Sequence, residues 1–187
     1  MPIPLGILAQ FRQAAAGDFV LLESQVLSSN QSSVTFSGLG AYASQYRHLQ
    51  VRAVVRTSRA DIADTMIMRV NGNSSSSSYR SHALVGTGSS VVSEDYSTLS
   101  GIFAGQPTSA NATANAFDAV VLDLLDPFDA SKNKTVRRLS GNPNTPRVWL
   151  TSGLWISTAS ITSLEFLSLN AANFVTGTRF SLYGIRG

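Results

Sequence analysis

The chain has 187 residues, of which 13% are charged, and it carries a net charge of +3 and no cysteine. A domain of this length buries roughly 70% of the surface of its unfolded chain, so it can be stable without disulfides. The lack of cysteine excludes disulfide and thiolate chemistry. Nucleic-acid-binding domains usually carry a dense basic patch, and a membrane helix needs roughly 18 apolar residues in a row. The sequence has neither feature, so we expect no nucleic-acid partner and no membrane.

The first 17 residues differ from the rest, and we expect them to form an N-terminal arm. The segment Ala14-Ala15-Ala16 resembles a signal-peptide cleavage site, but no Lys or Arg precedes the apolar run, and Pro2 and Pro4 interrupt it. Because a signal peptide needs a basic start and an unbroken apolar run, we expect the arm to be retained. It either packs on its own domain or anchors the chain to a neighbour. The candidate anchor residues are Leu5, Ile7, Leu8 and Phe11.

Residues 18–187 are expected to form one domain of β-strands. Runs of β-branched and aromatic residues alternate with turn formers, which is typical of strands joined by turns. The predicted strands cover residues 19–27, 33–37, 46–57, 65–71, 79–85, 117–125, 135–140 and 147–157. Residues 86–116 are the least regular part and predict long connections and edge structure. Two closing strands, around 164–169 and 180–185, carry apolar residues in both phases, so each should be covered on more than one face.

Two of these strands show a clear alternation. In 46–57, one face is aliphatic and the other carries Arg52 and Arg56, while in 65–71 Arg69 points away from the apolar face. If these two strands pair, the three arginines form a basic stripe on one outer face. That stripe is either an interface, because a guanidinium pairs well with partner groups, or an ordinary solvated surface.

The number and type of the predicted elements favour one fold class. About ten strands with little helix indicate a sandwich or a barrel, and a single open sheet would expose too much apolar surface. We therefore predict an all-β fold, an antiparallel β-sandwich of jelly-roll type with a short N-terminal arm.

Few residues are suited to catalysis or metal binding. Neither His48 nor His82 has a second metal ligand at a suitable spacing. Asp123, Asp126 and Asp129 are three residues apart, whereas a calcium loop places its ligands two apart and needs a glycine. We expect these aspartates to flank and cap a hairpin turn. The common nucleophile, phosphate-binding and dinucleotide motifs are missing from the sequence, so we expect no enzymatic activity, no metal and no cofactor.

Aromatic residues offer one alternative kind of site. Trp149, Trp155 and Tyr79 could provide flat surfaces for stacking on a sugar. Aromatic residues of β-sandwiches are also common in cores and interfaces, so both interpretations remain open.

Six segments, taken in their order along the chain, resemble those of a known family. They are MPIPLGIL, SSVTFSGLGAYASQYRHLQVR, MRVNGNSSSSSYRSHALVGTGS, ATANAFDAVVLDLLD, KNKTVRRLSG and the closing ITSLEFLSLNAANFVTGTRFSLYGIRG. Together they resemble small virion structural proteins of tailed bacteriophages, described as head decoration or fibre-like proteins, whose last strand reads F-S-L-Y-G-I. One departure is the opening, which runs directly into FRQAAAGDFV without the Gly-rich spacer of the relatives.

The resemblance implies a non-enzymatic building block of a virus particle. We expect it to decorate or cement the capsid through its arm and strand faces, with the major capsid protein or tail proteins as partners. It would be assembled in the host cytoplasm and form a homo-oligomer, with a trimer favoured because trimers suit both capsid threefold positions and fibres. The alternatives are a tail- or fibre-associated module that binds host-surface glycans and a polysaccharide-processing enzyme.

Overall fold

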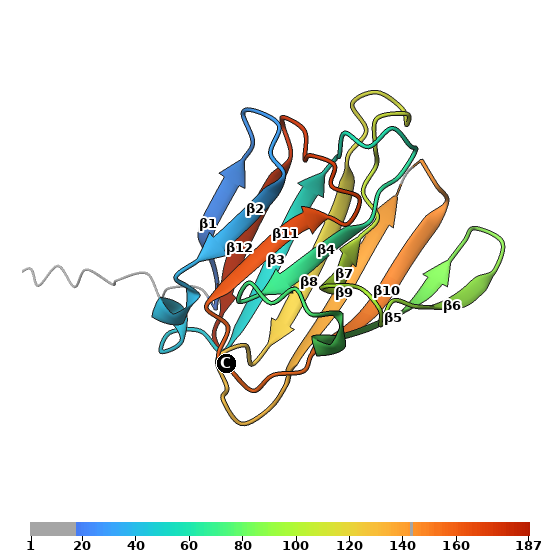
Figure 1. Cartoon of the computed structure of the whole chain (residues 1–187). Coiled ribbons are helices and arrows are strands. Elements are labelled where there is room, and N and C mark those ends of the chain that lie inside the picture. Colours follow the sequence, from blue (N-terminus) through green and yellow to red (C-terminus); the bar gives the residue numbers. More distant parts are fainter. Residues whose placement is uncertain (1–17, 143) are drawn as a thin grey trace, which may run out of the picture.

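The computed structural model describes residues 18–142 and 144–187, which form almost nothing but β-strands and their connections (Figure 1). The candidate anchor residues Leu5, Ile7, Leu8 and Phe11 lie outside the described residues. The strands are β1 (Phe19–Val26), β2 (Ser33–Ser37), β3 (His48–Val55), β4 (Met66–Val70), β5 (Tyr79–Gly86), β6 (Val91–Asp95), β7 (Ile102–Gly105), β8 (Asp118–Leu125), β9 (Lys134–Asn142), β10 (Arg147–Trp155), β11 (Ser163–Ser168) and β12 (Arg179–Ile185). Two short 3-10 helices, η1 (Leu39–Tyr42) and η2 (Ser76–Ser78), precede β3 and β5.

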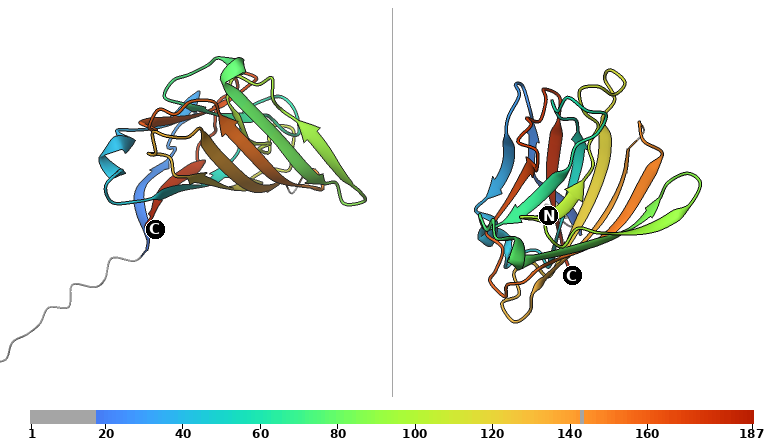
Figure 2. Two further views of the ribbon diagram at one scale, coloured as in Figure 1. Left: turned by 90° about the horizontal axis from the view of Figure 1, so that it is seen from below. Right: turned by 45° about the vertical axis from the view of Figure 1, so that its right-hand side comes forward.

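The strands form two antiparallel sheets that pack against each other, so the predicted antiparallel β-sandwich is confirmed (Figure 2). The larger sheet has eight strands in the order β1-β12-β3-β8-β9-β10-β5-β6. The smaller sheet has four, in the order β2-β11-β4-β7. The alternating aliphatic residues of β3, β8 and β4 face inward and form the main core with the phenylalanines of the closing strands.

The two closing strands hold central positions in opposite sheets. β11 lies between β2 and β4, and β12 lies between β1 and β3. Phe166 of β11 and Phe180 of β12 meet between the sheets, with ring centroids 4.9 Å apart, and Phe174 of the connecting loop contacts Phe180 at 5.3 Å. One face of each closing strand is buried in the core, but the other is partly exposed, and Leu169 is 42% exposed, so the expected cover on more than one face is not found.

The part predicted to be long connections and edge structure contains two edge strands, β6 and β7, whose bounds were not predicted. β6 is an edge strand paired only with β5, and most of its side chains are exposed, so it lacks the alternation that identifies a half-buried strand. β7 is short and buried throughout. The predicted hairpin partner of residues 117–125 is confirmed, because β8 and β9 pair in antiparallel register.

The larger sheet extends beyond the smaller one. The hairpins β5–β6 and β9–β10 lie together at one side of the larger sheet, after β8. Without these four strands, each sheet would have four strands: β1-β12-β3-β8 and β2-β11-β4-β7. The inner face of the extension has its own small core of Ala83, Val85, Phe103 and Trp149.

Gly184 is required where β12 passes the ring of Tyr46. A Cβ atom at position 184 would lie 2.5 Å from two ring carbons of Tyr46, whose side chain is buried. The ring therefore takes the space that any other side chain on this strand would need. This contact accounts for the glycine of the closing phrase FSLYGI.

We expect Gly184→Ala to lower the free energy of unfolding by about 1–3 kcal/mol, because the methyl group displaces a buried ring. Gly40→Ala is the control, since nothing lies within 4 Å of a Cβ built there. The control should change stability by less than about 1 kcal/mol. Urea unfolding of both variants measures the difference, and equal losses would contradict the role given to Tyr46.

Candidate functional site

The predicted basic stripe does not form. Arg52 lies on β3 of the larger sheet and Arg69 on β4 of the smaller sheet, so these strands do not pair. Alternation identifies the face of a strand but not its neighbour, and the chain changes sheets between β3 and β4. The expectation that Arg52, Arg56 and Arg69 share one surface is therefore wrong.

Arg56 and Arg69 have structural partners instead. The Arg56 guanidinium donates to four backbone oxygens of the 106–117 loop, at Ala110, Ala112, Thr113 and Ala116. Arg69 donates to the carbonyl oxygen of Ser100 and lies 3.8 Å from the carboxylate of Glu165. Only Arg52 of the three is exposed on a sheet face.

The three aromatic residues proposed as sugar platforms are buried. Trp149 and Tyr79 have no exposed surface, and Trp155 is 3% exposed. The Tyr79 hydroxyl accepts a hydrogen bond from the Val70 amide and donates to the carbonyl oxygen of Asn73. Stacking on a sugar needs an exposed ring face, so this interpretation of Trp149, Trp155 and Tyr79 is wrong.

A buried arginine that the sequence analysis did not single out supports the extension of the larger sheet. Arg138 of β9 is 1% exposed, and its guanidinium lies over the ring of Phe103, 4.2 Å from the centroid. Its Nε and Nη2 atoms donate to Thr151 Oγ1 of β10, and burial lowers its pKa to about 9. The alternation of β9 could have identified this burial, because Arg138 is two residues after Val136 and so lies on the same, buried face of the strand.

Asp126 and Asp129 lie in the turn between β8 and β9, as expected, whereas Asp123 lies within β8 and pairs with Arg137. Asp126 has a positive φ of 45°, and its carboxylate pairs with Arg47 and Lys132, which holds the pKa of Asp126 below its usual value. Its backbone amide donates to His48 Nδ1. Asp129 accepts hydrogen bonds from the amide and hydroxyl of Ser131. In the part of the chain that the structure describes, no group of three or more histidines and carboxylates could hold a metal ion.

Exposed apolar residues gather on one face of the larger sheet, the face turned away from the smaller sheet, which we call the outer face. Of the thirteen large apolar residues that are exposed in residues 18–142 and 144–187, nine lie there and four do not. The strand registers and phases identify the nine as Phe19, Leu21, Val26, Leu84, Val91, Leu125, Leu139, Val148 and Leu150. The other four are Ile62, Val92, Ile156 and Leu169.

Across the extension and the adjoining strands β8 and β3, apolar residues of the outer face form two rows that run across the strands. The registers place Leu84, Leu150, Leu139 and Val121 side by side on β5, β10, β9 and β8. The next row on the same face reads Val91, Gly86, Val148, Gly141, Ala119 and Val54. The leucines and Val148 are each more than half exposed. We call these two rows the aliphatic patch; its exposed area is on the order of a few hundred Å², the size that marks interaction sites on monomers.

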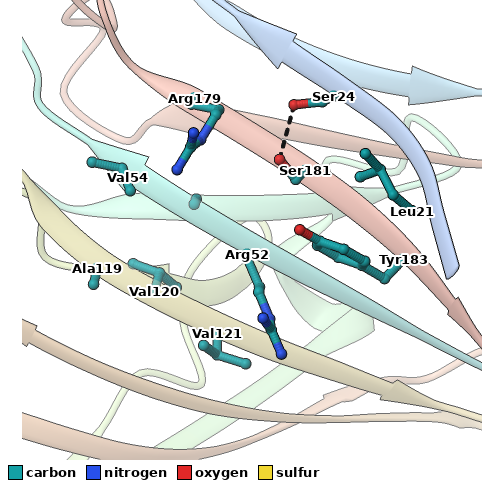
Figure 3. A pocket seen from close by; sticks show the side chains of 11 residues that line it. Leu21, Ser24, Arg52, Val54, Ala119, Val120, Val121, Arg179, Ser181 and Tyr183 are labelled. Atoms are coloured by element: carbon teal, nitrogen blue, oxygen red, sulfur yellow. Dashed lines mark hydrogen bonds between the residues drawn. The ribbon is translucent and has the colours of Figure 1, made fainter. Parts of the chain in front are cut away.

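Three hollows lie on the outer face, and the smallest, of about 280 Å³, is lined by Arg80, His82 and Leu154. The largest, of about 490 Å³, lies beside Gly141 and is lined by Ala119, Val148 and Phe117. The second, of about 440 Å³, lies over β12 and β3 (Figure 3). Its polar lining comes from Arg52, Arg179, Tyr183 and the hydrogen-bonded hydroxyls of Ser24 and Ser181. Neither Arg52 nor Arg179 is within 4.0 Å of a carboxylate of the described residues.

Comparison with protein-family models and with curated proteins found no match for the sequence. In the described residues, no helix has the length and apolar character needed to cross a membrane.

The 106–117 loop borders the aliphatic patch and is held by a buried carboxylate. Asp118 is 2% exposed and accepts hydrogen bonds from the amide and hydroxyl of Thr108, at 2.6 and 2.7 Å. Burial raises the pKa of Asp118 to about 6, because desolvation outweighs these hydrogen bonds. Asn144 also donates to the Thr108 hydroxyl, which ties the loop to the turn between β9 and β10.

We expect Asp118 to make stability depend on pH. Its pKa is higher in the folded chain than in the unfolded chain, so its contribution is fully present below about pH 4 and is lost as the pH rises through about 6. The stability difference between the native chain and Asp118→Asn should therefore shift by about 1–3 kcal/mol against the native chain from pH 4 to pH 7. Urea unfolding across this range measures it. A difference that does not vary with pH would contradict the raised pKa.

Proposed function

We propose that the protein is a non-enzymatic structural subunit of a tailed-phage virion, which decorates or cements the capsid. The observation that carries the proposal is the outer face of the larger sheet. A monomer in water rarely exposes nine large apolar side chains on one sheet face, because their burial against a neighbour releases ordered water. A subunit built for assembly has this surface, and the resemblance to virion structural proteins indicates the kind of assembly.

The strand order supports a jelly roll within the confirmed sandwich. A jelly roll has eight strands in two sheets and recurs in viral capsid domains. When the two hairpins are left out, the two sheets have the orders β1-β12-β3-β8 and β2-β11-β4-β7. Successive strands then alternate between the sheets from β1 to β4 and from β7 to β12, which is compatible with a jelly roll. We infer a jelly roll into which the hairpins β5–β6 and β9–β10 are inserted.

The absence of a recognisable reaction centre is compatible with this proposal. No Asp or Glu among the described residues lines either of the two larger hollows, and Asp118, whose pKa is raised, is buried and bonded to Thr108. We propose no catalytic role for any residue.

The virion role is tested on purified particles of the phage that encodes the chain. A reconstruction should show many copies over the capsid shell, with this chain in contact with the major capsid protein. Few copies at the tail would favour the tail-associated alternative. Absence from the particle would contradict both.

The arm gives a second test. We expect a chain without residues 1–17 to fold and yet to be lost from particles, because its candidate anchor, Leu5, Ile7, Leu8 and Phe11, is removed. Replacement of these four residues by serine should have the same effect. Replacement of the polar Gln10 and Gln13 by serine is the matched control and should leave incorporation unchanged. Normal incorporation of the truncated chain would contradict the anchor role.

One observation favours the alternative function, a tail- or fibre-associated module that binds host-surface glycans. The hollow over β12 and β3 combines two arginines without carboxylate partners among the described residues, hydroxyl groups and the ring of Tyr183 (Figure 3). These groups suit the carboxylate and hydroxyls of an acidic sugar.

The glycan alternative predicts that uronic-acid oligosaccharides bind at this hollow. Arg179→Ala should weaken binding at least about tenfold, since a charge-assisted hydrogen bond is lost. Arg80→Ala, which removes an exposed arginine elsewhere on the same sheet, is the control. Titration followed by calorimetry measures both, and binding unaffected by Arg179→Ala would contradict this site.

A further inference from the structure

We propose that two copies of the chain pair through the aliphatic patch, with the larger sheets face to face. The twofold axis lies between β9 and β10 and runs approximately along the strands. This inference goes beyond the virion role and does not depend on it, because it follows from the strand registers and exposures alone.

The size of the face fits a stable pair. On either side of the axis lie β10, β5 and β6, and β9, β8 and β3. Six strands about 4.8 Å apart and about eight residues long give a face of roughly 700 to 800 Å². A standard protein interface buries about 800 Å² on each partner. Two sheets stacked in this way are in the aligned class, with strand directions within about 30°.

The first aliphatic row is complementary to itself under this axis. The rotation places β9 over β10 of the second copy and β8 over β5 of the second copy. Leu139 then faces Leu150 of the second copy, and Val121 faces Leu84 of the second copy. All four positions lie in one cross-strand row, so the rotation returns every aliphatic side chain to an aliphatic partner.

The second row matches large residues to small ones. Val148 of one copy faces Gly141 of the other, where the hollow of about 490 Å³ lies. Ala119 faces Gly86, which has open space beyond its Cα, and Val54 faces Val91. A projecting valine over a glycine is the kind of fit that close packing at an interface requires. An axis between other pairs of strands would not bring Val148 over Gly141.

The polar row beside the patch is also complementary. It reads Asp95, His82, Ser152, Arg137, Asp123 and Gln50 across the same strands. The rotation places Asp123 over His82 of the second copy and Gln50 over Asp95 of the second copy. Asp95 is exposed, with no cation within 4.0 Å among the described residues. Arg52 of the second copy lies in the neighbouring row, two residues after Gln50 on β3. Asp123 is already paired with Arg137 of its own chain, 2.8 Å away, and the rotation places the Gln50 side chain opposite Asp95.

The pairing leaves the rest of the outer face free. β12 and β1 lie beyond the covered strands, so Arg179 and Tyr183 stay exposed, whereas the side of their hollow formed by Val54, Ala119 and Val121 is covered (Figure 3). The described chain begins at Asp18, next to β1, which is also outside the contact. A pair of this kind can therefore still contact other proteins through both regions.

The test begins with the full chain in dilute solution, studied by sedimentation equilibrium. We expect a species of twice the chain mass of 19.9 kDa. Leu150→Lys should raise the dimer dissociation constant at least about 100-fold, because a buried unpaired ammonium is costly to desolvate. Ile62→Lys is the matched control, since Ile62 is similarly exposed but lies outside the sheets. Circular dichroism verifies that both variants are folded.

Cross-linking tests the position of the twofold axis on a chain in which Leu139 and Leu150 are unchanged. The protein has no cysteine, so only introduced thiols react. Leu84 and Val121 lie three strands apart in one chain, about 14 Å, but face each other across the proposed interface. A bis-maleimide of about half that span should join Leu84→Cys/Val121→Cys chains into covalent dimers. Each single cysteine variant should give few.

The outcomes separate the proposal from its rivals. A dimer that Leu150→Lys dissociates and that the double cysteine variant traps supports it. A monomeric native chain, a trimer, or a dimer unaffected by Leu150→Lys would overturn it. A dimer that resists cross-linking at positions 84 and 121 would overturn the placement of the axis.

Discussion

The structure depends on the burial of its two last strands in the middle of opposite sheets. β11 completes the smaller sheet between β2 and β4, and β12 completes the larger sheet between β1 and β3. Their phenylalanines meet in the core, so the sandwich closes only when the C-terminal segment is in place. Residues near both ends of the chain thus contact each other, and such non-local pairing is the slow step in the folding of β-proteins.

The two closing strands were also among the elements that the sequence predicted. Apolar runs flanked by turn formers are enough to identify these strands, although the second face of each is partly exposed. The strands from β3 to β5 and from β8 to β12 were predicted from the same local signals, and their bounds differ from the expected ones by a few residues. The sandwich class followed from their number, since so many half-apolar strands need a second layer to cover them.

What could not be predicted is the partner of each strand. Alternation places Arg52 and Arg69 opposite the apolar side of their strands, but the two strands belong to different sheets. Sequence gives no local sign of this, because pairing is decided by residues far along the chain. The same limit applies to Trp149 and Leu150. Both phases of β10 carry apolar residues, and only the structure shows that Trp149 faces the interior and Leu150 the outer face.

The buried cations of β9 are linked to the extension of the sheet. Arg138 is covered by Phe103 of β7, and Lys134 donates to three backbone oxygens, at Asp129, Lys132 and Thr158. The Lys134 pKa is lowered by burial, yet its hydrogen bonds satisfy the ammonium group. The inner face of β9 carries Lys134 and Arg138, whereas aliphatic residues of β9 and β10 lie on the outer face. An inverted distribution of this kind fits a surface that is covered in the assembled state.

The position of the β5–β6 hairpin has a consequence for biosynthesis. In the larger sheet β5 pairs only with β6 and with β10, and β10 is encoded far downstream of it. At a synthesis rate of about 10 residues per second, the hairpin leaves the ribosome several seconds before its neighbour. During that interval Leu84, Val85 and Val91 have no sheet to join. The nascent chain is therefore a natural client for a chaperone that shields this hairpin until β10 emerges.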